Sequence, residues 1–452
     1  MGDRSEHLQQ LFSEGSLLLQ DGKTSQALVC FQAALKVDPL NPLLNLFAGV
    51  ALHDLKRYEE AVVCYETALQ CKPHMGEIHN NLGNSLMALG RFEDAADSFS
   101  RAVSLLPPSP VPMAARATAL QALGKVAEAE ADCRKALVIA PDFAAAHWNL
   151  ALNLLLQGRY DEGWREYEWR WRKPDFTSPL RHSGTPLWDG SPLQGQTILL
   201  HAEQGFGDAI QFARYVPLVV ACGGNVVLEC HPQLVSLFRG IKEVTAVVSF
   251  NEPVPVCSCQ APLLTLPRIF GTTLQNIPST CPYLAVNVER QQKWSALMSI
   301  YQQSPRIGLV WAGKSYPDPL RSCRLADFAP IAVGNATFFS LQLGSGNEEV
   351  NKPPSDMPLI DLTNHISDFA DTAALIEQLD LVVSIDTAVA HLAGALGKPV
   401  FILLPYAPDW RWLLERIDSP WYPTARLFRQ EMPGDWSGVV RHVQRALNEL
   451  LR

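Results

Sequence analysis

A 34-residue period runs through the first third of the chain and constrains its fold more than any other feature. Four prolines keep this spacing, and two sets of alanines keep the same step: Pro39, Pro73, Pro107 and Pro141; Ala34, Ala68, Ala102 and Ala136; Ala27, Ala61, Ala95 and Ala129. Glycine recurs on the same grid at Gly22, Gly90, Gly124 and Gly158, with Lys56 in the remaining position. Small residues at fixed places in a unit of this length predict two antiparallel helices that pack closely and end at the proline.

The period and the small-residue positions resemble those of tetratricopeptide repeats. Large side chains on the same grid, Phe31, Tyr65 and Phe99, are expected to fill the space between paired helices. The fourth repeat has Cys133 at that place. The fifth has Gly163 instead of the small alanine and ends in a Trp- and Arg-rich helix, which we interpret as a cap on the next domain. Stacked helix pairs form a concave surface that commonly binds peptides, so a protein or peptide partner is expected there. The alternative is that the repeats only hold a dimer or a scaffold.

The composition favours a folded protein that acts on small molecules or proteins. With 452 residues, the chain is long enough for two or three domains. The formal net charge is −9 and no run of Lys and Arg stands out, which argues against nucleic acid as the main partner. The amino terminus lacks the pattern of a signal peptide, and no apolar run reaches the roughly 18 residues of a membrane span. The ten cysteines include no CxxC pair, so we expect a reduced, cytoplasmic protein without a zinc site.

After the repeats, the pattern changes to alternating strands and helices. Residues 173–196 are rich in Pro, Gly and Ser, and we interpret them as a linker that follows the repeats of residues 1–172. Strand-like runs and helical segments then form two tandem α/β halves, residues 197–303 and 304–452. The irregular segment "NEPVPVCSCQAPLLTLPRIFGTTLQNIPSTCPYLAV" is expected along the edge of the first half. The expected fold class is therefore α plus α/β: a helical solenoid followed by two parallel-sheet units that bind ligands at the carboxyl ends of their strands.

The segment "LVVSIDTAVAHLAG" is the strongest candidate for chemistry. An apolar strand stops at Asp386, a favourable helix N-cap, and a helix of small residues follows with Thr387 in its first turn. A helix amino terminus presents unpaired N–H groups and the positive end of a dipole, so it attracts phosphate. Thr387 and His391 are four residues apart and share a helix face, so a hydroxyl and an imidazole are available to one anionic group. The alternative is a capped helix whose His is satisfied by its neighbours.

A further group of candidate residues follows the first strand of each α/β half. In "EQGFGDAIQF", Gly205 and Gly207 are expected to allow positive φ and the close approach of a ligand, and Asp208 stands at the helix start. Asp208 is either a helix cap or a general base that takes a proton from an acceptor hydroxyl. Lys314 and Arg321 follow the first strand of the second α/β half. They are either cations that neutralise a diphosphate leaving group or solvated surface charges.

These motifs resemble glycosyltransferase family 9, the heptosyltransferase-like enzymes. The stretch "LDLVVSIDTAVAHLAGALGKPV" resembles the family's D-T-x-x-x-H signature, and "GFGDAIQFARYVP" is similar to its amino-terminal G-x-G-D loop. Other similar stretches are "GLVWAG", "SLQLG", "DFADTAALI", "PDWRWLL" and "SPWYPTARLFRQ". Over essentially its whole length, the chain resembles a bacterial subgroup in which tetratricopeptide repeats precede such a domain.

The resemblance implies a GT-B fold of two Rossmann-like halves. It also implies sugar transfer from a nucleotide-diphosphate donor with inversion at the anomeric carbon, without a metal or another cofactor. By position, Asp208 matches the catalytic base. The segment around the donor diphosphate is matched by four residues: Asp386, which shapes the turn, Thr387, Ala388 and His391. Ala388 stands where heptosyltransferases often have Gly, which bears on the position of the donor or on the preferred sugar.

The first interpretation is therefore a glycosyltransferase that moves a sugar onto a protein or glycan presented by the repeats. The family's phosphate-binding Lys has no certain counterpart, and Lys314 and Arg321 are the candidates for its role. A second interpretation is similarity to protein O-GlcNAc transferases, which also join this repeat to a GT-B domain; the glycine loop and the Asp-Thr…His segment fit family 9 better. A third is a non-catalytic scaffold with a degenerate transferase domain, although such a remnant need not keep Asp208, Thr387 and His391 together.

Overall fold

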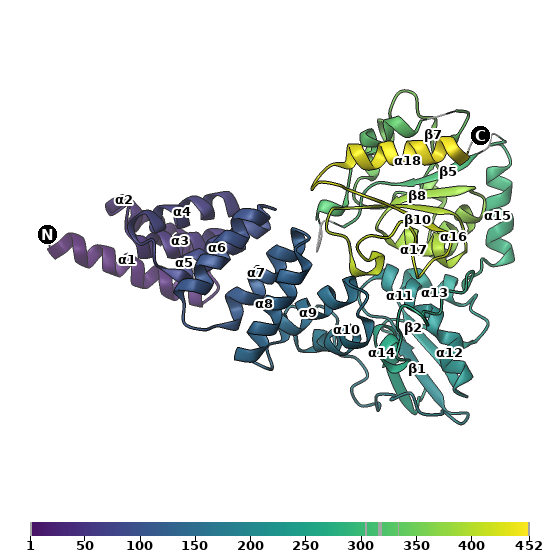
Figure 1. The fold of residues 1–452 in the computed structure, drawn as a ribbon, viewed down its shortest axis with the longest axis horizontal. Helices are drawn as coiled ribbons and strands as arrows, with labels where there is room; N and C mark the ends of the chain where they lie inside the picture. The colour runs from purple at the N-terminus through teal and green to yellow at the C-terminus, as the bar shows by residue number, and fades with distance from the viewer. Residues whose placement is uncertain (1, 303–304, 315–318, 333, 451–452) are drawn as a thin grey trace. The chain divides into compact units, whose positions relative to one another are not determined.

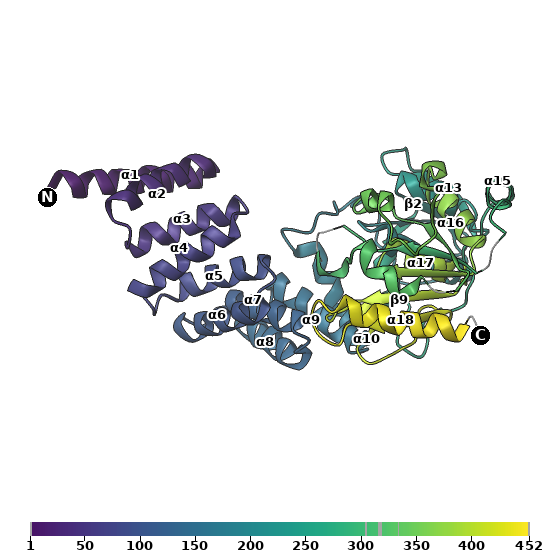
Figure 2. The same ribbon diagram turned by 90° about the horizontal axis from the view of Figure 1, so that it is seen from above.

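The computed structural model describes residues 2–302, 305–314, 319–332 and 334–450. It divides into two compact units, Met1–Asn153 and Leu154–Arg452. Figure 1 shows the elements coloured along the chain, and Figure 2 shows them after a rotation of 90°. The first unit consists of helices, and the described strands all lie in the second. This confirms the expected fold class of helical repeats followed by α/β structure.

Successive helices of the first unit pack in pairs, one repeat after another. Their bounds are Gly2–Gln20 (α1), Thr24–Val37 (α2), Pro42–Asp54 (α3), Tyr58–Cys71 (α4), Gly76–Ala88 (α5), Phe92–Leu105 (α6), Pro110–Ala122 (α7), Val126–Ile139 (α8) and Ala144–Leu156 (α9), the last of which crosses into the second unit. Figure 2 shows α1 to α6 lying side by side in this order. The alanines on the 34-residue grid are 0% exposed, as close packing of the paired helices requires: Ala27, Ala34, Ala61, Ala68, Ala95, Ala102, Ala129 and Ala136.

In three repeats, a glycine of the first helix lies against an aromatic ring of the second helix. A Cβ atom on Gly49 would lie only 2.5 Å from Cε1 of Tyr65. The three such pairs follow the same 34-residue step: Gly15 with Phe31, Gly49 with Tyr65, and Gly83 with Phe99. In the fourth repeat, the corresponding residues are Ala117 and Cys133, both buried. The departure of this repeat from the aromatic pattern is therefore compensated, because a larger first residue accompanies a smaller second one.

The turn inside each repeat requires a backbone in the left-handed region. Glycine provides it at four places with φ between 70° and 75°: Gly22, Gly90, Gly124 and Gly158. Lys56 takes the same place in the second repeat with φ 61°. A residue with a Cβ atom adopts this conformation at a steric cost, which glycine avoids. The glycines that recur in the sequence therefore mark left-handed turns, and the turn at Lys56 is the strained one.

The first half of the second unit is built on a four-stranded parallel sheet of strand order β3-β2-β1-β4. Its strands are Thr197–His201 (β1), Asn225–Cys230 (β2), Val244–Ser249 (β3) and Cys259–Pro262 (β4). Its helices are Phe206–Phe212 (α11), Val216–Ala221 (α12), Pro232–Phe238 (α13) and Leu266–Ile269 (α14). The short strand β4 lies in the segment that the sequence presents as irregular. It forms the edge of the sheet by pairing with β1, and its own residues carry no strand periodicity.

The second half is built on a six-stranded parallel sheet of strand order β10-β9-β8-β5-β6-β7. Its strands are Arg306–Val310 (β5), Thr337–Ser340 (β6), Leu359–Asp361 (β7), Leu381–Ile385 (β8), Val400–Leu404 (β9) and Ala425–Arg429 (β10). Its helices are Val288–Met298 (α15), Phe369–Glu377 (α16), Ala388–Ala395 (α17) and Trp436–Leu450 (α18). Every residue of β8 and β9 is buried, which explains why these strands read as continuous apolar runs.

Parts of the predicted last repeat and of the linker are built into the second unit. Helix α10 (Tyr160–Tyr167) buries Trp164, whose Nε1 donates to the carbonyl of Thr272 at 3.1 Å. Within residues 173–196, the N–H of Trp188 donates to the carbonyl of Gln260 in β4 at 2.8 Å. Both segments therefore fold with the α/β halves, to which they are tied by buried side chains and backbone hydrogen bonds.

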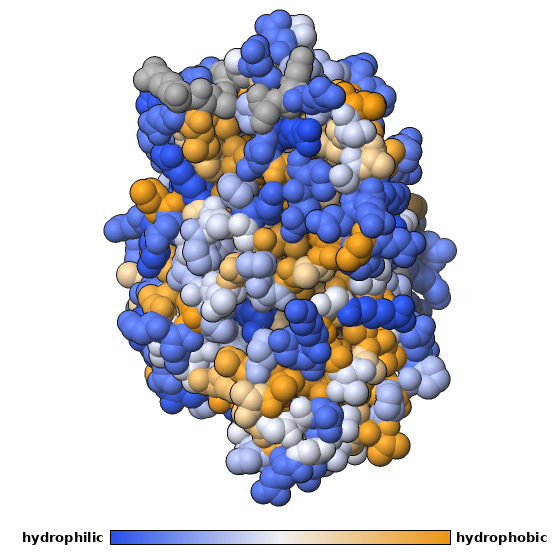
Figure 3. All heavy atoms as spheres, turned by 90° about the vertical axis from the view of Figure 1, so that its right-hand side faces the viewer, coloured by the Kyte–Doolittle hydropathy of each residue, from blue (hydrophilic) through white to orange (hydrophobic). Residues whose placement is uncertain are grey.

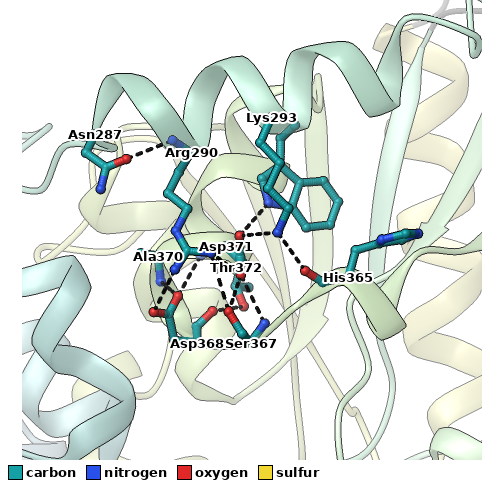
Figure 4. A network of polar contacts seen from close by, with 10 residues as sticks. Asn287, Arg290, Lys293, His365, Ser367, Asp368, Ala370, Asp371 and Thr372 are labelled. Carbon is teal, nitrogen blue, oxygen red and sulfur yellow. Dashed lines mark hydrogen bonds and ion pairs between the residues drawn. The ribbon is translucent and has the colours of Figure 1, made fainter.

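Figure 4 shows the polar contacts that tie helix α15 to α16, with the buried carboxylate of Asp371 at their centre. The Asp371 side chain accepts hydrogen bonds from Arg290 at 2.6 Å, from Lys293 at 2.9 Å and from Nε1 of Trp294 at 2.9 Å. Burial alone would raise the pKa of Asp371, but the hydrogen bonds, led by those of Ser367, outweigh it and lower that pKa. This network holds the helix at the start of the second half in place.

The face of the molecule in Figure 3 carries mostly hydrophilic residues, with smaller hydrophobic areas between them. Single exposed apolar side chains such as Val256 and Ile300 are ordinary on protein surfaces. Within the part of the chain that the structure describes, no helix combines the length and the apolar character that crossing a membrane requires.

Candidate functional site

Asp208 lies in the first turn of α11, which follows β1 at the carboxyl end of the first sheet. Its side chain is 28% exposed. Gly205 is the N-cap residue of α11 with φ −93°, so it does not take the positive φ that the sequence predicts. A Cβ atom on Gly205 would collide with Oδ2 of Asp208. The glycine therefore leaves room for the carboxylate of Asp208.

Gly207 brings α11 of the first half against α17 of the second half. A Cβ atom on Gly207 would lie 2.8 Å from Cδ2 of His391 and 3.6 Å from Cα of Ala388. The missing side chain thus lets two helices approach through their backbones. The close approach predicted for this glycine is an approach to a neighbouring helix.

The turn from β8 into α17 carries Asp386 and Thr387. The structure places Thr387 at the N-cap, with φ −143° and ψ 170°, so the assignment of the N-cap to Asp386 is wrong by one residue. The Thr387 side chain caps no N–H group of the helix, and its Oγ1 lies 3.0 Å from Oγ of Ser384. Thr387 and Ala388 are half-buried. The first turn of α17 therefore keeps N–H groups without a side-chain cap, which is the condition for attracting an anion.

His391 is turned into the core. The residue is 5% exposed, and its ring stacks on Trp412 with 5.4 Å between centroids. Its Nδ1 lies 2.9 Å from Oη of Tyr422. Burial, followed by the charges of Arg411 and Arg214, holds the pKa of His391 well below its usual range, so the imidazole is neutral at neutral pH. Tyr422 thus partners one nitrogen of His391, and the contact of this residue with a diphosphate stays a prediction.

Asp386 lies beside His391, with 3.8 Å between its Oδ1 and Nε2 of the imidazole. Its side chain is 15% exposed. Burial and the nearby Asp409 raise the pKa of Asp386 to about 6, against the opposing charges of Arg411 and Arg321. Carboxyl groups that titrate close to neutral pH are concentrated at functional sites.

Arg411 is the functional candidate that the sequence reasoning missed. It lies in the short 3-10 helix Trp410–Trp412 (η8) after β9, and its side chain is 9% exposed. Its Nη2 donates to Oδ1 of Asp208 at 2.5 Å, and its Nε donates to Oε1 of Gln211 at 2.6 Å. Its Nη1 donates to Oδ1 of Asp409 at 2.9 Å. The signal in the sequence is an arginine between two tryptophans in "PDWRWLL", but no spacing rule points to a partner 203 residues away.

Lys314 and Arg321, the predicted cations, follow β5. Lys314 is exposed, and its Nζ lies 5.9 Å from the ring centroid of Phe206, the first residue of α11. Arg321 donates through Nη2 to the carbonyl of Lys314 at 3.1 Å, and its charge lowers the pKa of Asp386. The Nε of Arg321 is buried and has no hydrogen-bond partner in the described structure. The two cations therefore border α11 and the turn at Asp386, respectively.

A second buried arginine, Arg214, also joins the two halves. Its Nη1 donates to the carbonyl of Trp421 at 2.6 Å, and its Nη2 donates to Oη of Tyr283 at 3.1 Å. The guanidinium carbon lies 4.6 Å from the ring centroid of Tyr422, which in turn contacts His391. No local sequence pattern points to Arg214, because an arginine inside a helical segment is usually a surface charge.

The predicted site residues thus gather where the starts of α11 and α17 meet. The arrangement combines a fixed carboxylate, an uncapped helix amino terminus and two bordering cations. Among the described residues, no three His, Cys, Asp or Glu side chains are grouped so that they could hold a metal ion. A surface cavity of about 310 Å³ is lined by residues 158–162 and 273–275, none of which belongs to the predicted site.

Family models match both parts of the chain. Tetratricopeptide repeat models match residues 49–90, 76–109 and 114–168. The model of glycosyltransferase family 9 (heptosyltransferase) matches residues 363–418. This matched segment contains the turn at Asp386, the whole of α17, and Arg411.

Relatives and solved structures resemble parts of the chain. Protein FlbA of Caulobacter vibrioides is 29% identical over 356 residues, which cover 71% of this chain and 58% of that protein. A fragment of MamA from Desulfovibrio magneticus RS-1 is 17% identical with a TM-score of 0.33, over 37% of this chain and 92% of that one. PilF of Pseudomonas aeruginosa is 22% identical with a TM-score of 0.34, over 37% of this chain and 76% of that one. The chain thus matches tetratricopeptide repeat models in its amino-terminal part and the family 9 model over one segment of its carboxyl-terminal part.

Proposed function

We propose that the second unit transfers a sugar from a nucleotide-diphosphate donor to the hydroxyl of an acceptor, with inversion at the anomeric carbon and without a metal ion. The observation that carries the proposal is the contact between the family 9 segment and the other half. Arg411 and α17, inside the matched residues, touch Asp208 and Gly207, outside them. Two elements that the resemblance assigns to one reaction are therefore in contact.

In the proposed reaction, Asp208 is the general base. Its Oδ1 is held by Arg411, and its Oδ2 lies over Gly205. The acceptor oxygen attacks the anomeric carbon and gives its proton to the carboxylate as the bond from that carbon to the diphosphate oxygen breaks. A base placed in this way removes the proton without needing a metal-bound nucleophile.

The leaving diphosphate would be stabilised at the start of α17. The uncapped N–H groups beside Thr387 and Ala388 face a developing negative charge favourably, because the helix dipole has its positive end there. Arg321 borders the turn at Asp386 and Lys314 borders the facing helix α11, and both would add positive charge. Loss of one electrostatic donor of this kind typically costs on the order of 10²- to 10³-fold in rate.

The acceptor is proposed to be a protein or a glycan that the first unit binds. The support is the repeat array itself, because stacked helix pairs of this type expose extended surfaces for peptides. The transferase unit would then act on a partner held close to it, which raises the effective concentration of the acceptor.

The test is a calorimetric and thermal-shift titration of the full chain with ADP-, GDP-, UDP- and dTDP-linked sugars. The informative pair of variants is Ala388→Glu and Ala388→Gln, which have the same shape and differ in charge. Glu at the first helical position stabilises the helix itself but repels a diphosphate. We expect one donor to stabilise the parent and the Gln variant and to bind the Glu variant much more weakly.

A second variant separates binding from chemistry. Asp208→Asn should bind the same donor as the parent does and should transfer its sugar on the order of 10²-fold or more slowly. Transfer would be followed as release of the nucleoside diphosphate in the presence of a cell extract that contains acceptors. A folded parent protein that binds none of the four donor classes would refute the proposed function.

A further inference from the structure

Arg411 and Asp208 form a charged contact between the two halves, and this contact has no counterpart in the repeat or donor motifs. We propose that Arg411 is a positioning residue that holds the catalytic base in place from the half that carries the donor site. The inference rests on the proposed function, because it gives Arg411 a role in that reaction. It adds a residue to the site and makes the placement of the base depend on contact between the halves.

The geometry of the guanidinium supports a positioning role. Three of its nitrogens donate, each to a different side chain, at 2.5 Å to Asp208, 2.6 Å to Gln211 and 2.9 Å to Asp409. Asp208 and Gln211 are one helical turn apart on α11, so two of the three bonds fix the same face of this helix. The third bond ties the guanidinium back to its own loop. A planar fork with all three directions occupied has little freedom to move.

The surroundings of Arg411 also favour one fixed orientation. Its guanidinium carbon lies 4.3 Å from the ring centroid of Trp410, and its side chain is 9% exposed. The Asp208 side chain is 28% exposed, so the carboxylate is anchored on one side and open on the other. The buried Arg411 thus orients the carboxylate, and the more exposed Asp208 remains accessible to a substrate.

A purely stabilising role explains this arrangement poorly. Burying an ion pair has a desolvation cost that often cancels its attraction, so a buried pair is weak evidence for stability. A positioning role explains why the charge is kept, because the guanidinium of Arg411 fixes Oδ1 of the Asp208 carboxylate by a charged hydrogen bond. The groups around Asp208 and Arg411 include Gln211 of α11, Asp409 of the same loop, Asp386 and His391 of the adjoining turn and helix, Tyr160 and Tyr167 of α10, and Glu203 after β1.

The test compares Arg411→Met and Arg411→Lys with a matched control, Arg416→Met. Arg416 likewise pairs with an aspartate, Asp418 at 2.5 Å, but its side chain is 41% exposed and its hydrogen bonds in the described structure stay within the second half. With the donor that the parent binds, we expect Arg411→Met to lower kcat on the order of 10²-fold while the KM for the donor stays within about threefold. Arg411→Lys should recover part of kcat, because it restores the charge without the fork. Arg416→Met should behave as the parent.

The decisive readout is the double variant with Asp208→Asn. If Arg411 acts through Asp208, then Arg411→Met should cause no further loss of kcat in the Asp208→Asn background. An equal loss in both backgrounds, or an increase in KM with unchanged kcat, would overturn the inference, because either result places Arg411 directly on a substrate. Unchanged kcat in a folded Arg411→Met or Arg411→Lys protein would overturn it as well.

Two controls distinguish a failure of the positioning role from misfolding and from a failure of the proposed function. Thermal unfolding identifies a variant that is misfolded, and the Lys variant then carries the test, since it keeps the charge of the buried side chain. If the parent transfers sugar and the Arg411 variants do so equally well, only the positioning role fails. If the parent binds no donor, the proposed function fails first and the role of Arg411 in that reaction fails with it.

Discussion

Gly207 and His391 touch across the two halves of the second unit, because a Cβ atom on Gly207 would lie 2.8 Å from Cδ2 of the imidazole. His391 cannot yield easily: it stacks on Trp412, and its Nδ1 lies 2.9 Å from Oη of Tyr422. The G-x-G-D loop and the Asp-Thr…His segment, which are separated by more than half of the α/β sequence, are therefore two sides of one packed contact.

We expect Gly207→Ala to loosen this contact. The added methyl group would overlap a buried ring that is held on two sides, and overpacking of this kind typically costs about 1–3 kcal/mol. Donor affinity should fall together with the free energy of unfolding, since α17 shifts with the ring. Urea unfolding and donor titration measure both quantities. Gly184→Ala is the matched control, because a Cβ atom there meets nothing within 4 Å. Equal stability of the two variants would contradict the close contact.

Asp386 should make the protein less stable as the pH rises. Its pKa is raised to about 6 in the folded protein, chiefly by burial and by Asp409. The folded state therefore holds this proton more tightly than the unfolded chain does, and the resulting stabilisation is lost as the pH rises through about 6. Above that pH, the ionised carboxylate costs on the order of 1–3 kcal/mol.

The variant Asp386→Asn removes this cost. It should unfold at a higher urea concentration than the parent at about pH 7.5, and its advantage should shrink at about pH 4.5. Asp418→Asn is the control, because the hydrogen bond from Arg416 lowers the pKa of Asp418 and its side chain is 62% exposed. For that control, we expect little change or a small decrease in the free energy of unfolding. If Asp386→Asn were less stable than the parent at the higher pH, the carboxylate would be contributing a hydrogen bond that outweighs its desolvation.

The sequence predicts the parts of this protein that depend on local spacing. The 34-residue grid identifies the helix pairs because each pair is closed by residues within one repeat, such as Gly49 against Tyr65. The motif at Asp386 likewise marks a strand, a turn and a helix that follow each other in the chain. Local patterns of this kind carry their own geometry.

The parts that the sequence does not predict depend on contacts between distant segments. Arg411 meets Asp208 from 203 residues away, and β4 is a strand because β1 lies beside it. The spacing predicts that His391 shares a helix face with Thr387, but Thr387 is the N-cap with an extended backbone, and α11 packs against His391, so the imidazole is buried. Tertiary packing decides what a helix face meets, and no helical periodicity contains that information.

Lys56 should be a site where a single change stabilises the first unit. Its φ of 61° is the left-handed conformation that glycine occupies in the other repeats. Lys56→Gly should therefore raise the free energy of unfolding by roughly 0.5–1 kcal/mol, because relief of the strain exceeds the extra entropy of glycine in the unfolded chain. The reverse change, Gly90→Ala at φ 74°, should lower it by a similar amount. Chemical denaturation followed by far-UV circular dichroism measures both, and a destabilised Lys56→Gly protein would show that the lysine side chain contributes more than the backbone strain costs.

The last prediction concerns where the α/β structure can be cut from the repeats. A chain that begins at Leu154 keeps α10 and the buried pair of Arg170 and Glu203, whose Nη2 and Oε1 are 2.8 Å apart. A chain that begins at Lys173 loses Trp164 and leaves Glu203 buried without its cation. Loss of a buried Trp costs about 3–5 kcal/mol and a broken buried ion pair costs about 3–5 kcal/mol, which together approach the 5–15 kcal/mol of a whole domain. The longer chain should therefore show cooperative thermal unfolding, and the shorter one should aggregate or unfold without a transition. A shorter chain that unfolds cooperatively at the same temperature would mean that α10 belongs to the repeats alone.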